Sequence, residues 1–102
     1  MNNLWILFIF IYALLKGSRE GMKKALQQVT AVELKQYRER NRLTQEAMAA
    51  RLRMSVRTYI DLEHGACLPS ATTLALHLAF LSKAEQARFL AAVKAAVEQV
   101  SV

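Results

Sequence analysis

The side chains best suited to specific recognition lie in one short stretch, Leu43–Gly65, in the most basic part of the chain. Gln45, Arg57 and Asp61 supply an amide, a guanidinium and a carboxylate, which hydrogen-bond in defined directions. If the stretch forms two short helices joined by a tight turn, these three side chains project outward together with Val56. A DNA major groove could accommodate such a surface, so the pattern indicates a helix-turn-helix over residues 44–65.

The elements that must position these side chains have matching core and cap signals. The predicted buried positions are Met48, Ala49, Leu52, Met54, Tyr59 and Leu62. Thr44 and Ser55 stand where a side-chain oxygen can accept the free amides of a first helical turn. Gly65 tolerates the left-handed backbone just past a helix end, and Pro69-Ser70 favours a new helix start.

The order and spacing of these residues resemble a known family. The matching positions are Leu34, Tyr37, Arg38, Leu43-Thr44-Gln45-Glu46, Ala49, Ser55, Thr58-Tyr59, Glu63, Gly65 and Pro69-Ser70. Together they resemble the lambda repressor/Cro-like (XRE-type) helix-turn-helix DNA-binding family over roughly residues 30 to 81. The resemblance implies that the second helix of the motif enters the major groove of DNA.

The resemblance also implies a role for individual residues. Base contacts are expected from Gln45, Val56, Arg57 and Asp61, and phosphate contacts from Arg42, Thr44, Arg53, Ser55 and Thr58. Arg57 could pair with guanine, Asp61 with the cytosine amino group, and Val56 with a thymine methyl. Arg38 and Glu63 match a structural ion pair between the first and third helices of the family.

Two features depart from the family pattern. Arg53 stands in the turn of the motif, where relatives most often have glycine, and a left-handed backbone there would cost up to about 1–2 kcal/mol. The loop Ala66–Leu68 lacks the basic residues that many relatives place against a phosphate. Both departures bear on affinity for DNA rather than on the fold.

Elsewhere the chain predicts further helices and no strands, giving an all-α, five-helix lambda-repressor-like domain over residues 22–102. The first helix is expected to begin at a Thr30-x-x-Glu33 capping box and to bury Val32, Leu34 and Tyr37. A fourth helix is expected from about Ser70 to Leu81, with His77 exposed on it. The last, over 82–100, begins with the capping box Ser82-x-x-Glu85.

Charge and composition narrow the classes of function. The net charge is +6, and Lys35–Arg57 holds seven basic residues against two acidic ones, whereas three basic and four acidic residues follow. Positive charge therefore coincides with the proposed DNA face. Cys67 is the only cysteine, and His64 and His77 have no neighbouring ligands in the sequence, so we expect no metal, no cofactor and no enzymatic activity. A lone cysteine also fits a reducing cytoplasm.

The first 21 residues differ from the rest in composition, because Leu4–Leu15 is apolar without a break. As a helix the run spans about 18 Å, short of the roughly 30 Å of a bilayer core. We expect an apolar leader or a short anchor, with Met22 as the preferred native start. The alternative is a regulator tethered to the inner membrane through Leu4–Leu15, with its DNA-binding domain in the cytoplasm.

The predicted function is that of a sequence-specific transcriptional regulator, a repressor that binds double-stranded DNA as a homodimer on a palindromic operator. The dimer candidates on the last helix are Phe89, Val93, Val97 and Val100. That row could equally close the core of the monomer. A different reading is an antitoxin, which binds DNA and also masks a protein toxin.

Overall fold

A computed structural model describes residues 19–100, so Leu4–Leu15 lies outside the described residues. The described part consists of five helices in the order α2 (Arg19–Arg40), α3 (Gln45–Arg51), α4 (Val56–Glu63), α5 (Ala71–Phe80) and α6 (Lys83–Glu98). No strand occurs within these residues. The all-α, five-helix prediction is therefore confirmed.

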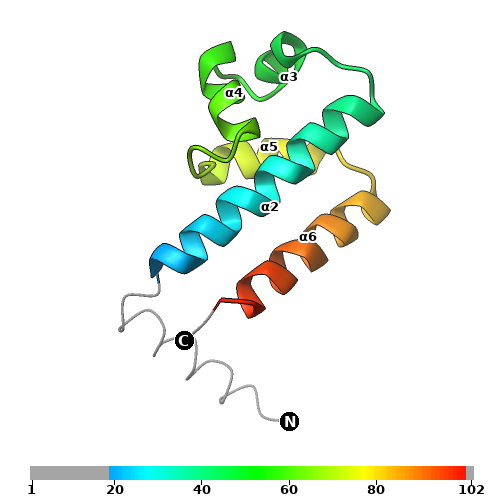
Figure 1. The fold of residues 1–102 in the computed structure, drawn as a ribbon. Helices are drawn as coiled ribbons and strands as arrows, with labels where there is room; N and C mark the ends of the chain where they lie inside the picture. Colours follow the sequence, from blue (N-terminus) through cyan, green and yellow to red (C-terminus); the bar gives the residue numbers. More distant parts are fainter. Residues whose placement is uncertain (1–18, 101–102) are drawn as a thin grey trace.

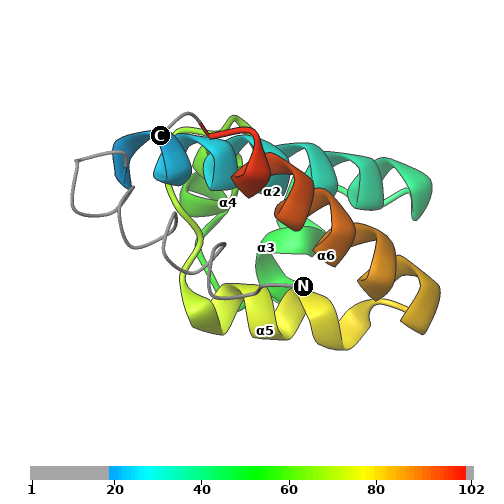
Figure 2. The same cartoon turned by 90° about the horizontal axis from the view of Figure 1, so that it is seen from below.

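The long helix α2 is the element against which the others assemble (Figure 1). It packs against α4 on one side and α6 on the other, while α3 packs on α4. Figure 2 shows α5 on the far side of α3 from α2, with α6 running between the level of α2 and that of α5. The buried core draws on α2, α3, α4 and α6 and on the turns that follow α3 and α5: Leu34, Tyr37, Met48, Ala49, Leu52, Tyr59, Leu62, Leu81 and Phe89. Helix α5 adds the partly buried Leu74, Leu76 and Leu78, which pack against this core.

Four helices begin at the cap residues that the sequence offers. Thr44, Ser55, Ser70 and Ser82 each accept a hydrogen bond from the backbone amide three residues later. Glu85 also accepts from the Ser82 amide at 2.8 Å, which completes the predicted capping box. These contacts are local, so neighbouring residues alone are enough to specify them.

Three helices end in the same backbone motif. After α4, the Gly65 amide donates to Leu62 O and the Ala66 amide to Asp61 O, with Gly65 at a φ of 72°. This is the Schellman arrangement, and glycine suits its left-handed position. The ends of α2 and α3 have the same pairs of bonds, but Arg42 and Arg53 hold the left-handed position at φ 54° and 59°.

Arg53→Gly is expected to stabilise the fold, because an L side chain strains a left-handed backbone by about 1–2 kcal/mol. The greater freedom of glycine in the unfolded chain offsets part of that gain, so we expect a net increase of about 0.5–1 kcal/mol in the free energy of unfolding. Urea denaturation measures it. Arg53→Ala is the matched control, since it removes the charge and keeps the strain. Equal stabilities of the two variants would contradict the strain argument.

The start of α2 differs from the prediction. The helix runs without a break through Thr30, which is buried in its middle, and Glu33 accepts no capping bond. Residues 20–29 are mostly good helix formers, and the contact of α2 with α6 supports them, so the local Thr-x-x-Glu signal is overridden. Val32 is 52% exposed rather than in the core. The boundary expected between residues 21 and 22 falls inside α2.

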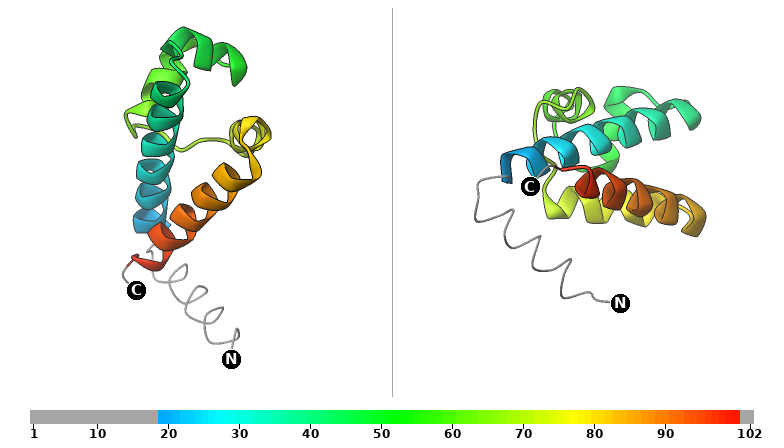
Figure 3. Two further views of the ribbon diagram at one scale, coloured as in Figure 1. Left: turned by 90° about the vertical axis from the view of Figure 1, so that its right-hand side faces the viewer. Right: turned by 60° about the horizontal axis from the view of Figure 1, so that its bottom comes forward.

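The prediction that His77 is exposed is also wrong. It is 2% exposed, and its Nε2 lies 2.8 Å from Glu33 Oε2 on α2. Its ring meets those of Tyr37 and Phe89 edge to face, with centroids 5.1 and 5.9 Å apart. His77 therefore joins α5 to α2 and α6. Figure 3 shows the ribbon of these three helices in two further views.

Candidate nucleic-acid interface

A buried carboxylate, Glu63 at the end of α4, holds the helix-turn-helix together. Arg38 donates to it twice, from Nε to Oε2 at 2.7 Å and from Nη2 to Oε1 at 3.1 Å. Gln45 Nε2 donates to Oε1 at 3.0 Å, and the Tyr59 hydroxyl donates to Oε2 at 2.6 Å. One side chain thus accepts bonds from α2, α3 and α4.

The environment keeps Glu63 ionised. Burial alone would raise the pKa of this carboxyl, but the hydrogen bonds from Arg38, Tyr59 and Gln45 outweigh it, and the pKa is lowered. The hydrogen bond to Glu63 raises the pKa of Arg38, while burial and the same carboxylate raise that of Tyr59. At neutral pH the site therefore contains a carboxylate, a guanidinium and a neutral phenol.

This network fixes the orientation of α4. Arg38 also donates from Nη1 to the carbonyl of Leu43 at 3.3 Å, so the same guanidinium anchors the turn between α2 and α3. The resemblance pointed to the Arg38–Glu63 pair, but the contributions of Gln45 and Tyr59 were missed. Tyr59 could have been found, because it lies one helical turn before Glu63 on the same face of α4.

The predicted base-contacting residues do not share one environment. The Arg57 side chain is 86% exposed and lies 3.7 Å from Asp61, an ion pair within one turn of α4. Val56 is half-buried and packs against the core, although we expected it to project outward. Gln45 is half-buried by its bond to Glu63. Arg57 is thus the most solvent-accessible of the four.

The predicted phosphate-contacting residues are all exposed. Thr44 and Ser55 use their hydroxyl oxygens as helix caps, and the Ser55 hydroxyl also donates to Thr58 Oγ1 at 2.9 Å. Arg42 and Arg53 lie in the turns before and after α3, at the left-handed positions described above. Within residues 19–100 neither arginine has an ion-pair partner. These two guanidiniums are therefore available to an anionic ligand.

Two other arginines in the basic stretch bind side chains of neighbouring helices. Arg40 pairs with Glu85 at 3.1 Å, and its guanidinium lies 5.8 Å from the centroid of the Tyr37 ring. Arg51 donates to the Tyr37 hydroxyl at 2.9 Å and stacks 5.0 Å from the centroid of Phe80. Both arginines brace helices against one another.

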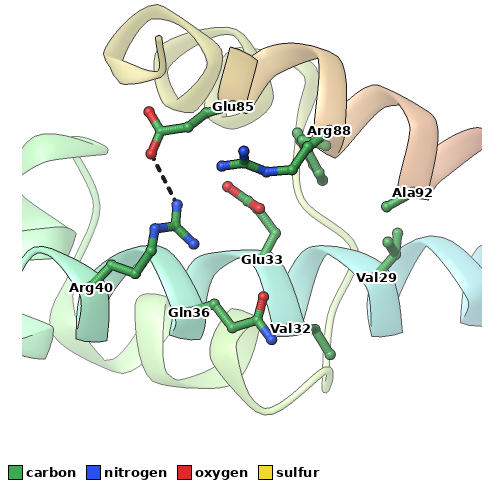
Figure 4. Close-up of a pocket in the computed structure, with 9 residues that line it drawn as sticks. Val29, Val32, Glu33, Gln36, Arg40, Glu85, Arg88 and Ala92 are labelled. Carbon is green, nitrogen blue, oxygen red and sulfur yellow. Dashed lines mark hydrogen bonds and ion pairs between the residues drawn. The ribbon is translucent and has the colours of Figure 1, made fainter.

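A cavity of about 170 Å³ lies between α2 and α6, away from the helix-turn-helix (Figure 4). Glu33, Arg40, Glu85 and Arg88 line it, so acidic and basic groups balance, and the Arg40–Glu85 pair spans one end. Its charges give no preference for an anion or a cation.

Among the described residues, no group of three or more His, Cys, Asp or Glu side chains could hold a metal ion.

The row that we predicted as a dimer contact begins in the core of the monomer and ends at Val100, two residues after the end of α6. Phe89 is buried in the core, Val93 packs against it, and Val97 and Val100 are half-buried. Phe89 is thus committed to the monomer. The large apolar side chain that α6 exposes is Leu90, at 54%.

No helix in residues 19–100 is both long enough and apolar enough to span a membrane.

One comparison with known proteins gives a result. A family model described as a helix-turn-helix domain matches residues 31–89, more than half of the chain. The match starts inside α2 and ends inside α6, so it includes α3, α4 and the Glu63 network. No curated protein and no solved structure matches the chain.

Proposed function

The chain belongs to the helix-turn-helix domain family, and from this premise we infer that it is a DNA-binding transcriptional regulator. The observation that carries the proposal is α4 itself. A buried carboxylate network fixes this helix, its exposed face presents Arg57, and the turn before it presents Arg53. We further propose that the protein is a sequence-specific repressor that acts by occupying promoter DNA.

In this proposal Arg57 reads bases and the arginines of the turns contact the backbone. The Arg57–Asp61 pair is long and exposed, so it contributes little and can open without much cost. Arg57 is then free for the O6 and N7 atoms of guanine, and Asp61 for a cytosine amino group. Gln45 uses one amide hydrogen on Glu63 and retains its carbonyl oxygen for a base or a bound water.

Arg57→Ala and Arg42→Ala are expected to weaken DNA binding in different ways. The first should cost about 1–3 kcal/mol on the preferred sequence and relax the preference at one base position in each half-site. The second should weaken all sequences alike and reduce the salt dependence by about one phosphate contact. Selection of bound DNA from a random pool, followed by titrations at several salt concentrations, separates the two. Uniform weakening by Arg57→Ala would contradict a base contact.

We propose a homodimer on a palindromic operator, because one recognition helix reads only a few base pairs. With Phe89 in the core and Val93 packed on it, Val97 and Val100 are the remaining dimer candidates on that row. Enrichment of palindromes with half-sites about one helical turn apart would support this arrangement. Enrichment of single, asymmetric sites would contradict it.

The proposal places the protein in the cytoplasm, where its DNA lies, and assigns it no catalytic activity and no cofactor. The antitoxin alternative adds a protein partner, and an adjacent reading frame for a small basic toxin would favour it. In the tethered alternative, Leu4–Leu15 would also bind the inner membrane. Recovery of the native protein with the membrane fraction would support that alternative over a freely diffusing regulator.

A further inference from the structure

An apolar groove lies between α2, the loop before α5, α5 and α6, and no residue of α4 lines it. Its volume is about 200 Å³, and its lining includes Leu26 of α2, Leu68 of the loop before α5, Leu74 and Leu78 of α5, and Leu90 and Val93 of α6. Leu68 is 44% exposed and Leu90 is 54% exposed. Among the described residues that line the groove, Thr30 is the polar one, and it is itself buried. Apolar surface of this kind is stabilised when another apolar segment covers it.

We propose that Leu4–Leu15 of the same chain covers this groove. The run is apolar throughout, and only Lys16, Gly17 and Ser18 separate it from the first residue of α2. Leu26 lies seven residues into α2, roughly 10 Å along its axis from Arg19. Three linker residues span up to about 10 Å, and a glycine among them eases a chain reversal. The run can therefore turn back and reach the groove.

The end of the domain from which the run emerges is already closed by packing. A Cβ added at Gly21 would lie 3.3 Å from Val100 Cγ1, so the region after α6 lies beside the first turns of α2. The groove opens alongside this contact, between Leu26 on α2 and Val93 on α6. The segment that precedes α2 in the sequence therefore starts near one end of the groove.

The short covalent connection favours Leu4–Leu15 over a second copy of the chain as the occupant of the groove. A segment joined by three residues acts at an effective concentration of about millimolar, far above that of a second copy in a dilute solution. The groove holds a few side chains rather than a whole helix, so insertion of residues such as Phe8 is the form of docking that its volume allows. As a helix the run is too short to cross a bilayer alone, and exposed to water it would form a large apolar patch.

The proposal changes the role expected for residues 1–21. As a dispensable leader they would leave Leu68 and Leu90 uncovered. As a cover they become part of the domain and compete with a second copy for the side of α6 that carries Val93. The inference does not depend on DNA binding, because the groove and the exposed face of α4 share no residue.

Photocrosslinking of the full 102-residue chain tests it. Leu90→p-benzoylphenylalanine places a reactive group at the groove, and mass spectrometry after digestion identifies the residues that it captures. We expect adducts within the same molecule to Leu4–Leu15, and their loss when Phe8→Asp is added. The matched control places the same group at Ala91, which is exposed on α6 and does not line the groove. That control should capture no residue of the run.

Three results would overturn the proposal. In a mixture of ¹⁴N and ¹⁵N protein, mixed-isotope adducts would show that a second copy occupies the groove. Adducts restricted to residues of the groove itself would show that nothing covers it. With phosphatidylglycerol vesicles present, sedimentation with the vesicles and loss of the intramolecular adduct would assign the run to the membrane. Because DNA titrations are a separate measurement, failure here leaves the regulator proposal standing.

Discussion

Glu63→Ala is expected to lower the free energy of unfolding by about 3 kcal/mol or more, because it leaves the Arg38 guanidinium without its partner. The expected loss lies near the lower end of the range for buried pairs, since water reaches part of the Arg38 side chain. The substitution also removes the acceptor of Tyr59 and Gln45. Urea denaturation monitored by circular dichroism gives the value.

Glu46→Ala is the matched control for this experiment. Glu46 is an exposed carboxylate one residue after Gln45 on α3, and it has no ion-pair partner within residues 19–100. Its removal should change stability by less than about 0.5 kcal/mol. If Glu63→Ala kept the native melting temperature and lost only DNA binding, the carboxylate would act at the DNA surface and the structural assignment would be inverted.

The same carboxylate predicts a dependence of stability on pH. The folded state lowers the pKa of Glu63, so its contribution is complete above the unfolded pKa of about 4.3. That contribution is lost as the pH falls through the lower folded value. The stability difference between the native chain and Glu63→Gln should therefore be constant near neutrality and shrink below about pH 4. A difference that grows on acidification would contradict the direction of the shift.

His77→Ala is the second change with a large expected effect, a loss of about 2–4 kcal/mol in the free energy of unfolding. It empties space between Tyr37 and Phe89 and leaves Glu33 without its hydrogen bond. Thermal unfolding measures the loss. His77→Phe keeps a ring and removes the hydrogen bond, so its stability should lie between those of the native chain and the alanine variant.

His64→Ala provides the comparison for this second prediction. His64 is exposed at the end of α4, and its removal should leave the melting temperature nearly unchanged. Similar melting temperatures for His77→Ala and His64→Ala would mean that His77 does not hold α5 against α2. DNA affinity, measured well below the melting temperature, should be affected little by either variant.

Local hydrogen bonds explain why so much of the helix-turn-helix could be predicted. The oxygens of Thr44, Ser55, Ser70 and Ser82 bond three residues ahead, and Gly65 closes a bond pattern only six residues long. Such bonds form whenever the residues after the cap adopt a helical first turn, and they need no contact with a distant part of the chain. The apolar faces of the two motif helices could also be predicted, because the helical repeat fixes which residues share a face.

The same local logic failed where distant elements intervened. Thr30 and Glu33 have the spacing of a capping box, but packing of α2 against α6 favours a continuous helix through them. Glu33 then bonds His77, 44 residues away. A polar residue on a mostly apolar helix looks exposed in the sequence, since nothing near it reveals that a carboxylate on another helix will satisfy it.

The amino-acid sequence by itself determined where the helices of the motif begin and end and which of their faces is apolar, because those features depend on residues three or four positions apart. Only the tertiary structure decided that Glu63 joins α2, α3 and α4 and that His77 is buried. These features depend on the free energy of packing elements that are far apart in the chain, and no local spacing encodes it.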